Sequence, residues 1–238
     1  MPSSAARIPK AERTRRQILA AAERRFAQAG FERTRLDDIA DDIGMVGSAI
    51  LYHFADKREL YRAVRDDLAA DLFAAVEQAV AGETPPRRRL VALVRASVRA
   101  VAARPQLASI ALREAMSNDP GVERHANPLL LRIIALFEEG VRTGDIQPTR
   151  NEPYHFFSAV AGTILFYVAA LPHFVTDLPR DHLSAERMET LESDAVAIAE
   201  RLLGMQQGPR PVRIPGGLDN EPHRPRVAPD AKPRGESA

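Results

Sequence analysis

The first thirty residues carry apolar side chains at the spacing of an amphipathic helix. The positions that recur at intervals of three and four residues are Ile18, Leu19, Ala22 and Phe26. This spacing places them on one face of a helix with 3.6 residues per turn. Gly30 follows, where a helix end favours a residue that tolerates positive φ. The pattern therefore predicts a helix that ends at Gly30.

Two short helices with a sharp turn between them are predicted next. Thr34 and Asp37 have the spacing of a capping box that would begin the first one. Gly44 interrupts the pattern where a tight turn needs a residue without Cβ. The second short helix ends at Phe54. A small core is expected from the apolar residues of these segments, namely Ile18, Phe26, Ile39, Ile43, Ile50 and Phe54.

Beyond this region the apolar spacing stays helical to about residue 204. Asp56 and Glu59 form a second capping box, which predicts a long helix from near Lys57. Gly144 and Gly204 mark two later helix ends. Other boundaries are expected at Thr84-Pro85, Arg104-Pro105, Asn118 to Pro120, Asn151, Pro172 and Ser184. Because no segment alternates with period two for the length of a strand, the predicted fold class is all-α.

Residues 14–60 of the 238 combine these features in the layout of a helix-turn-helix. On these residues the chain resembles the TetR family of transcriptional repressors. The resemblance implies a flexible basic arm over 1–10 and a three-helix DNA-binding domain over 11–56. A helical domain for ligand binding and dimerisation is expected over 57–205. The remaining residues, 206–238, are rich in Pro and Gly and are expected to be disordered.

The resemblance also assigns DNA contacts, with two departures from the family pattern. Val46 stands where the family has a small hydroxyl residue, and Leu51 stands where it has a phosphate-binding tyrosine. These departures leave the identity of individual contacts and the DNA affinity open. We expect DNA contacts from Arg15, Thr34, Val46, Gly47, Ser48, Tyr52, His53 and Lys57, with Thr34 and Lys57 on phosphates. In the alternative, Tyr52 or His53 packs beneath the helix.

The charge distribution agrees with a nucleic-acid partner. The whole chain is nearly neutral, with 33 basic and 32 acidic residues. Residues 1–35 hold nine basic and three acidic residues, which gives 9 − 3 = +6. A basic segment that leads into a DNA-binding helix adds affinity by neutralising phosphates. The alternative is a solvated helix face beside a disordered end. The four acidic residues Asp37, Asp38, Asp41 and Asp42 are expected to face away from the phosphates.

The C-terminal helices are candidates for dimerisation and ligand binding. The helix over 156–171 is apolar nearly all round, which is typical of an interface or of a monomer core. The resemblance implies a homodimer through the helices near 153–171 and 184–204, a pseudo-palindromic DNA operator and a small-molecule effector. The expected pocket residues are Leu112, Met116, Phe137, Phe157, Phe166, Tyr167 and His173, which plain core packing would equally explain. Arg113 and Glu114 are expected either to orient a ligand or to form a surface ion pair.

Several function classes fit poorly. The chain has no cysteine, and its N-terminus lacks the apolar core of a secretory signal. Its longest apolar stretch, over 156–171, is shorter than the roughly 20 residues of a membrane span, which predicts a cytoplasmic protein without a membrane partner. Motifs for zinc peptidases, serine hydrolases and nucleotide binding are absent. No cofactor and no metal site are expected, although His155 and His173 would bind a metal as an effector if they met.

These observations predict a sequence-specific, DNA-binding transcriptional regulator, namely a homodimeric repressor that a small ligand releases from its operator. It is not expected to be an enzyme. The alternative is a DNA-architectural or non-specific DNA-binding dimer without an inducer. The two differ in whether any small molecule changes the affinity for DNA.

Overall fold

The computed structural model describes residues 9–116, 127–147, 153–179 and 181–204. Within these ranges the regular elements are helices and no strand occurs, so the all-α prediction is confirmed. In chain order they are α1 (Lys10–Arg33), α2 (Leu36–Asp41), α3 (Gly47–Leu51), α4 (Lys57–Ala81), α5 (Pro86–Ala103), α6 (Gln106–Ala115), α7 (Pro128–Thr143), α8 (Pro153–Leu165), the π-helical turn η1 (Phe166–Ala170), α9 (Leu171–Phe174) and α10 (Ala185–Leu202).

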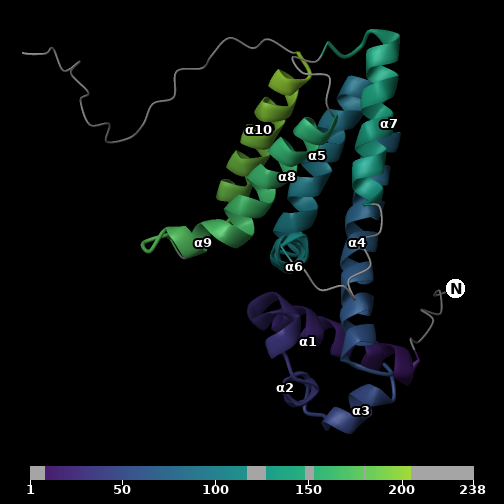
Figure 1. Ribbon diagram of the computed structural model, residues 1–238, viewed down its shortest axis with the longest axis vertical. Helices are drawn as coiled ribbons and strands as arrows, with labels where there is room; N and C mark the ends of the chain where they lie inside the picture. Colours follow the sequence, from purple (N-terminus) through teal and green to yellow (C-terminus); the bar gives the residue numbers. More distant parts are fainter. Residues whose placement is uncertain (1–8, 117–126, 148–152, 180, 205–238) are drawn as a thin grey trace, which may run out of the picture. The chain divides into compact units, whose positions relative to one another are not determined.

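Helices α1, α2 and α3 form the head of the molecule, at one end of α4 (Figure 1). Gly30 leaves the helical conformation with φ of 78°, which breaks α1 just before its last residues. Gly44 has φ of 66° and forms the turn between α2 and α3. Both predicted glycine positions are confirmed. The predicted head core is also confirmed, since its members are buried apart from the half-buried Ile43.

The predicted capping box at Thr34 and Asp37 is wrong. Helix α2 has Arg35 at its N-cap, and no side chain there accepts a backbone hydrogen bond. Thr34 is buried instead, and its hydroxyl donates to the carbonyl of Gly30 at 2.7 Å. The carbonyls at the end of a helix lack an intrahelical partner, and a buried hydroxyl needs one. Thr34 therefore closes α1 rather than opening α2.

The second predicted capping box is confirmed and begins α4. The backbone N–H of Glu59 donates to Asp56 Oδ1 at 2.7 Å, and the Glu59 carboxylate accepts from the N–H of Ala55. This reciprocal arrangement satisfies two donors at the start of the helix. Because α4 packs against both α1 and α5, it connects the head to the remaining helices, here called the body.

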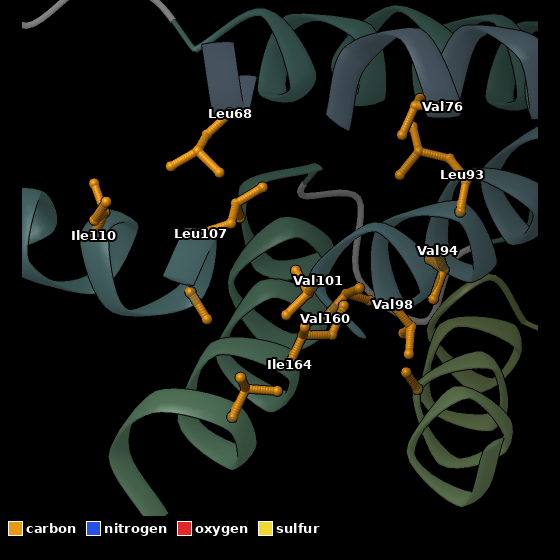
Figure 2. Packing of buried hydrophobic residues seen from close by; sticks show 14 of the residues in the cluster. Leu68, Val76, Leu93, Val94, Val98, Val101, Leu107, Ile110, Val160 and Ile164 are labelled. Carbon is orange, nitrogen blue, oxygen red and sulfur yellow. The ribbon is translucent and has the colours of Figure 1, made fainter. Parts of the chain in front are cut away.

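The body is organised around α5. This helix packs against α4, α7 and α10, while α8 contacts α6, α7 and α10 (Figure 1). Buried side chains from four helices meet in its core, as Figure 2 shows for Leu68 and Val76 of α4, Leu93 to Val101 of α5, Leu107 and Ile110 of α6, and Val160 and Ile164 of α8.

The start of one helix in the body differs from the prediction. Helix α5 begins at Pro86, with Pro85 and not Thr84 at its N-cap. Proline supplies no side-chain acceptor there, so Asp145, from the turn after α7, accepts the N–H of Arg87 at 2.7 Å. Ser184 lies at the N-cap of α10 as predicted, although its side chain makes no capping bond. The boundaries expected at Asn118 to Pro120 and at Asn151 lie outside the described residues.

Pro172 does not end the apolar helix, contrary to the prediction. Residues Pro153–Phe174 form one continuous helical run of 22 residues, in which η1 has the wider π-helical turn. The N–H of Leu171 there donates to the carbonyl of Phe166, five residues earlier. A proline ring clashes with the carbonyl four residues before it in a regular α-helix. The wider turn lets the chain pass Pro172 without that clash and continue to Phe174.

Candidate nucleic-acid interface

Helix α3 is attached to the head by one face and exposed on the other. Ile50 and Phe54 are buried and hold the segment against the head core. At 100° per residue, Ser48 and Tyr52 lie about half a turn away from Ile50 and Leu51 about a quarter of a turn, and all three are exposed. Tyr52 is 86% exposed and Leu51 is 50% exposed. The outward face of α3 is therefore free to enter a groove on a binding partner.

Tyr52 and His53 behave differently from each other. The exposure of Tyr52 contradicts the alternative in which it packs beneath the helix. His53 is half-buried, and its ring meets the Tyr52 ring edge-on, with centroids 5.3 Å apart and planes at 88°. Edge-to-face aromatic pairs are favourable because the positive edge of one ring meets the negative face of the other. His53 therefore restricts the orientation of the exposed Tyr52 ring.

Gly47 and Arg15 flank this surface. A Cβ added at Gly47 would lie 2.2 Å from Asp37 Oδ1, so the start of α3 passes very close to α2. Arg15, exposed on α1, places its guanidinium 4.9 Å from the centre of the Phe54 ring, just beyond the end of α3. A cation over an aromatic face is held in place without losing its charge. Arg15 thus carries a positive charge to the edge of the α3 surface.

The structure places the two side chains expected on phosphates, Lys57 and Thr34, in contacts within the head. Lys57 Nζ donates to the carbonyls of Phe31, Thr34 and Glu32 at 2.9, 3.2 and 3.3 Å, and it lies 4.3 Å from the centre of the Phe31 ring. An ammonium has three donors, so all of them are used within the protein. The Thr34 side chain is buried and faces α1. Both residues join the loop after α1 to the rest of the head.

An ion pair joins α1 to the end of α2. Arg25 donates to Asp42 through two nitrogens, at 2.7 and 2.5 Å. This hydrogen bonding holds the pKa of the Asp42 carboxyl below its ordinary value. The bidentate geometry is specific to guanidinium and carboxylate groups. One of the four acidic residues near α2 is thus neutralised by a basic residue of α1, which the spacing in the sequence did not reveal.

A cluster of charges centred on Arg104, here called the Arg104 node, links head and body. Arg104, in the turn between α5 and α6, donates to Glu23 of α1 at 2.6 Å and to Asp67 of α4 at 2.9 Å, and it also pairs with Asp71. These bonds, that to Glu23 first, raise the pKa of Arg104 above its ordinary value. The pattern of apolar and polar positions did not predict this node. The available signal was Glu23 itself, a charged residue on the apolar face of α1.

Arg113 and Glu114 of α6 contact two different helices, α1 and α4. Arg113 donates to the carbonyl of Gln28 at 3.0 Å, near the break in α1. Glu114 lies against α4, where burial raises its pKa above the ordinary value and the nearby Arg65 opposes that rise. Burial likewise raises the pKa of Tyr61 on α4 to about 12, and the charge of Glu114 adds to it. In the structure, Arg113 thus connects α6 to α1, and Glu114 lies between α6 and α4.

The structure does not gather the seven expected pocket residues around one cavity. Phe166 and Tyr167 line a groove of about 390 Å³ between α8 with η1 and α10, together with Thr163, Leu171, Arg187, Thr190, Leu191 and Asp194. Phe137 packs against Phe156 in the core, with ring centroids 6.1 Å apart. Leu112 and Phe157 are half-buried, whereas Met116 and His173 are exposed and border other surfaces.

The two histidines considered as metal ligands do not meet. His155 and His173 lie on the same continuous helical run, 18 positions apart, which corresponds to about 27 Å at 1.5 Å per residue. Across the described ranges, no three His, Cys, Asp or Glu side chains come together as a metal-binding group. A metal bridge between these two histidines is therefore excluded by the helix that carries them.

The run Pro153–Phe174 is more exposed than its composition suggests. Within the described ranges it is one helical run whose length and hydropathy would also suit a membrane span, and 22% of the relevant window is buried. The 16-residue apolar stretch counted from the sequence was too short because the helix continues through Pro172. Length and composition alone do not distinguish a span from an interface helix. The outward face of this run thus leaves large apolar side chains uncovered, including Tyr154, Phe166 and Phe174.

Comparisons with known proteins identify the head and its attached body. A family model described as bacterial regulatory proteins, tetR family, matches residues 18–64. The transcriptional activator FasR of Mycolicibacterium smegmatis is 30% identical over 193 residues, covering 70% of this chain and 86% of FasR. The transcriptional repressor KstR2 of the same organism is 29% identical over 139 residues, covering 56% and 68%.

A solved structure shows the same fold over most of the described chain. The regulator FadR from Bacillus subtilis, in complex with stearoyl-CoA, superposes with a TM-score of 0.62 at 16% identity, covering 81% of this chain and 99% of FadR. The likeness spans the head and the body together, and the identity to FasR extends over most of that relative. The chain therefore belongs to the TetR family of bacterial regulatory proteins, and it is a DNA-binding transcriptional regulator.

Proposed function

We propose that the protein is a homodimeric repressor that binds an inverted-repeat operator through α3 and leaves it when a small molecule binds the body. The observation that carries this proposal is the outward face of α3, which is exposed while Ile50 and Phe54 anchor the helix. In helix-turn-helix proteins the second helix lies in the major groove. We place the protein in the cytoplasm, where its DNA is, and assign it no catalytic role, as its named relatives are regulators.

Contacts to DNA are assigned from the positions of the side chains. Val46, Ser48 and Tyr52 reach the groove because they are exposed on and beside α3. Gly47, whose missing Cβ leaves room for Asp37, begins the helix that carries these side chains, and His53 supports Tyr52. Arg15 reaches a phosphate at the edge of the surface, which adds a salt-dependent and sequence-independent contribution to binding. Thr34 and Lys57 act within the head rather than on the DNA.

Selection of genomic fragments tests the DNA-binding proposal. The purified full chain is mixed with sheared genomic DNA at moderate salt, and the bound fragments are sequenced. A recurring inverted repeat is expected, with half-sites about one helical turn, or a multiple of it, apart. If no sequence is enriched over random fragments, the architectural alternative, in which the head binds DNA without specificity, would be favoured.

The dimer surface is assigned to α8 with η1 and to α10. The outward face of Pro153–Phe174 is apolar and largely unburied, and helices that are apolar nearly all round are covered in stable proteins. Gly162 lies on this surface, and an added Cβ there meets nothing within 4 Å. Gly162→Arg therefore leaves the protomer intact but places a charge in the proposed interface. We expect a monomer in light scattering, with weaker operator binding.

A matched control separates this effect from a general effect of charge. Gln78→Arg adds the same side chain at an exposed position of α4 and should leave the dimer intact. If both variants remain dimeric at equal concentration, the two-fold interface lies elsewhere. If both become monomeric, the added charge and not the position is responsible.

A ligand is sought first among long-chain acyl-CoA molecules, because FadR, which shares the fold, was solved with stearoyl-CoA. A ligand that binds the folded state raises the melting temperature as its concentration exceeds its Kd. Release of the operator at the same concentrations is expected of an inducer. A rise in melting temperature without any change in operator affinity would contradict the proposed coupling. A reporter gene behind the operator distinguishes repression from activation, since the named relatives include one of each.

A further inference from the structure

The segment that includes α3 lacks the side chains that usually read bases through paired hydrogen bonds. Residues 45–55 contain no Arg, Lys, Asn, Gln, Asp or Glu. Arg or Lys binds guanine with two hydrogen bonds, Asn or Gln binds adenine, and Asp or Glu accepts from cytosine. The polar groups that remain are Ser48, Tyr52 and His53, each of which supplies single hydrogen bonds. Sequence reading by this helix therefore needs another source of discrimination.

Exposed apolar side chains are concentrated on this same segment. In the described head, residues 9–56, the large apolar side chains with high exposure are Val46, Leu51 and Tyr52. Val46 is 68% exposed at the N-cap of α3, the end that contacts base edges in helix-turn-helix proteins. The other large apolar residues of the head are buried in the core or half-buried against it. An apolar surface of this kind gains free energy when it is covered by another apolar group.

The major groove of DNA presents one apolar group, the C5-methyl of thymine. We propose that Val46 and Leu51 read thymine methyl groups, so that the half-site under α3 is specified by thymines rather than by guanines. The proposal rests on the DNA-binding function proposed above. It explains how a helix with Val and Leu at these two exposed positions retains sequence preference. The hydroxyl of Ser48 and the Tyr52 ring add single polar contacts beside the methyl groups.

Replacement of thymine by deoxyuridine tests this directly, because the two bases differ only by the methyl group. Synthetic duplexes of the selected operator are prepared, each with deoxyuridine in place of thymidine at one position and at its symmetry-related position in the other half-site. Burial of one methyl-sized group corresponds to about a fourfold change in Kd. Replacement in both half-sites should therefore weaken binding about fifteenfold at the thymines under α3. Thymines in the spacer between half-sites should show no change.

Variants of the protein show which side chain contacts each thymine methyl group. Val46→Ala should bind the normal operator about as weakly as the wild type binds the matching deoxyuridine duplex. It should lose little further affinity on that duplex, because the same contact is already absent. Leu51→Ala should behave likewise at a different thymine. Ser48→Ala, on the same face, is the matched control and should keep the full deoxyuridine effect. Because these side chains are exposed, equal melting temperatures are expected for all variants.

The outcomes separate this inference from the function on which it rests. The proposal is supported if deoxyuridine at half-site thymines weakens binding of the wild type but has no such effect on Val46→Ala or Leu51→Ala. An operator that is bound equally well with and without the methyl groups overturns it, while the DNA-binding function stands. Failure to select any operator overturns both. A deoxyuridine effect of the same size in every variant also overturns it, because the methyl groups then act through DNA shape rather than through these side chains.

Discussion

Removal of the Arg104 guanidinium should destabilise the protein because it leaves a buried carboxylate without its charged partner. Glu23, the main partner, has a side chain that is 11% exposed, whereas Arg104 is 28% exposed and Asp71 is 63% exposed. Breaking a fully buried pair costs about 3–5 kcal/mol, and an exposed pair contributes about 0–1 kcal/mol. The partial exposure of Arg104 reduces the first figure. We therefore expect Arg104→Gln to cost about 2 kcal/mol of unfolding free energy, most of it through Glu23.

Thermal and urea unfolding at a fixed protomer concentration measure this cost, because the stability of a dimer depends on concentration. A loss of about 2 kcal/mol corresponds to a fall of roughly 4–8 °C in Tm for a protein of this size. The double variant Arg104→Gln with Glu23→Gln should be less than additive, since the uncompensated charge is then absent. Asp71→Asn is the control and should cost under about 0.5 kcal/mol.

Two results would refute this reasoning. If Arg104→Gln lowered Tm no more than Asp71→Asn, the Arg104 node would be an exposed network without a buried partner. If the effects of Arg104→Gln and Glu23→Gln added fully, the two residues would act independently of each other. Either result would remove the Arg104 node as a link that holds α1 against α4 and α6.

Three further variants test local electrostatics. Lys57→Met keeps the aliphatic part of the side chain over Phe31 but removes the ammonium, and it should lower the free energy of unfolding in urea by about 1–2 kcal/mol. If Tm is unchanged and the salt dependence of DNA binding falls by about one unit of slope, Lys57 contacts a phosphate instead. Because burial raises the pKa of Glu114, its ionisation opposes folding as pH rises, so Glu114→Gln should raise Tm at pH 7 and lose this advantage at acidic pH. Hydrogen bonds from Arg99 lower the pKa of Glu192, so its contribution is lost as pH falls; Glu192→Gln should lower Tm at pH 7 but not in acid.

Local features of the sequence were sufficient to predict the head. The apolar period of α1, the glycines that end it and form the turn, and the capping box at Asp56 all act between residues close in the chain. Each of these features restricts the backbone by itself, whatever the rest of the chain does. The same holds for the exposed face of α3, since half a turn separates Ser48 from the buried Ile50.

The partners of the polar side chains were decided only by the tertiary structure. Lys57 has the charge and the position along the chain of a phosphate contact, yet the carbonyls of Phe31 and Glu32 at the end of α1 and of Thr34 just after it lie within its reach. Glu23 and Arg104 are 81 residues apart and meet because α6 returns to α1. A side chain of this length takes whichever partner folding brings nearest, and a buried donor or acceptor must find one. Periodicity and caps therefore determined the helices, while long-range packing determined which charged groups remain available to DNA.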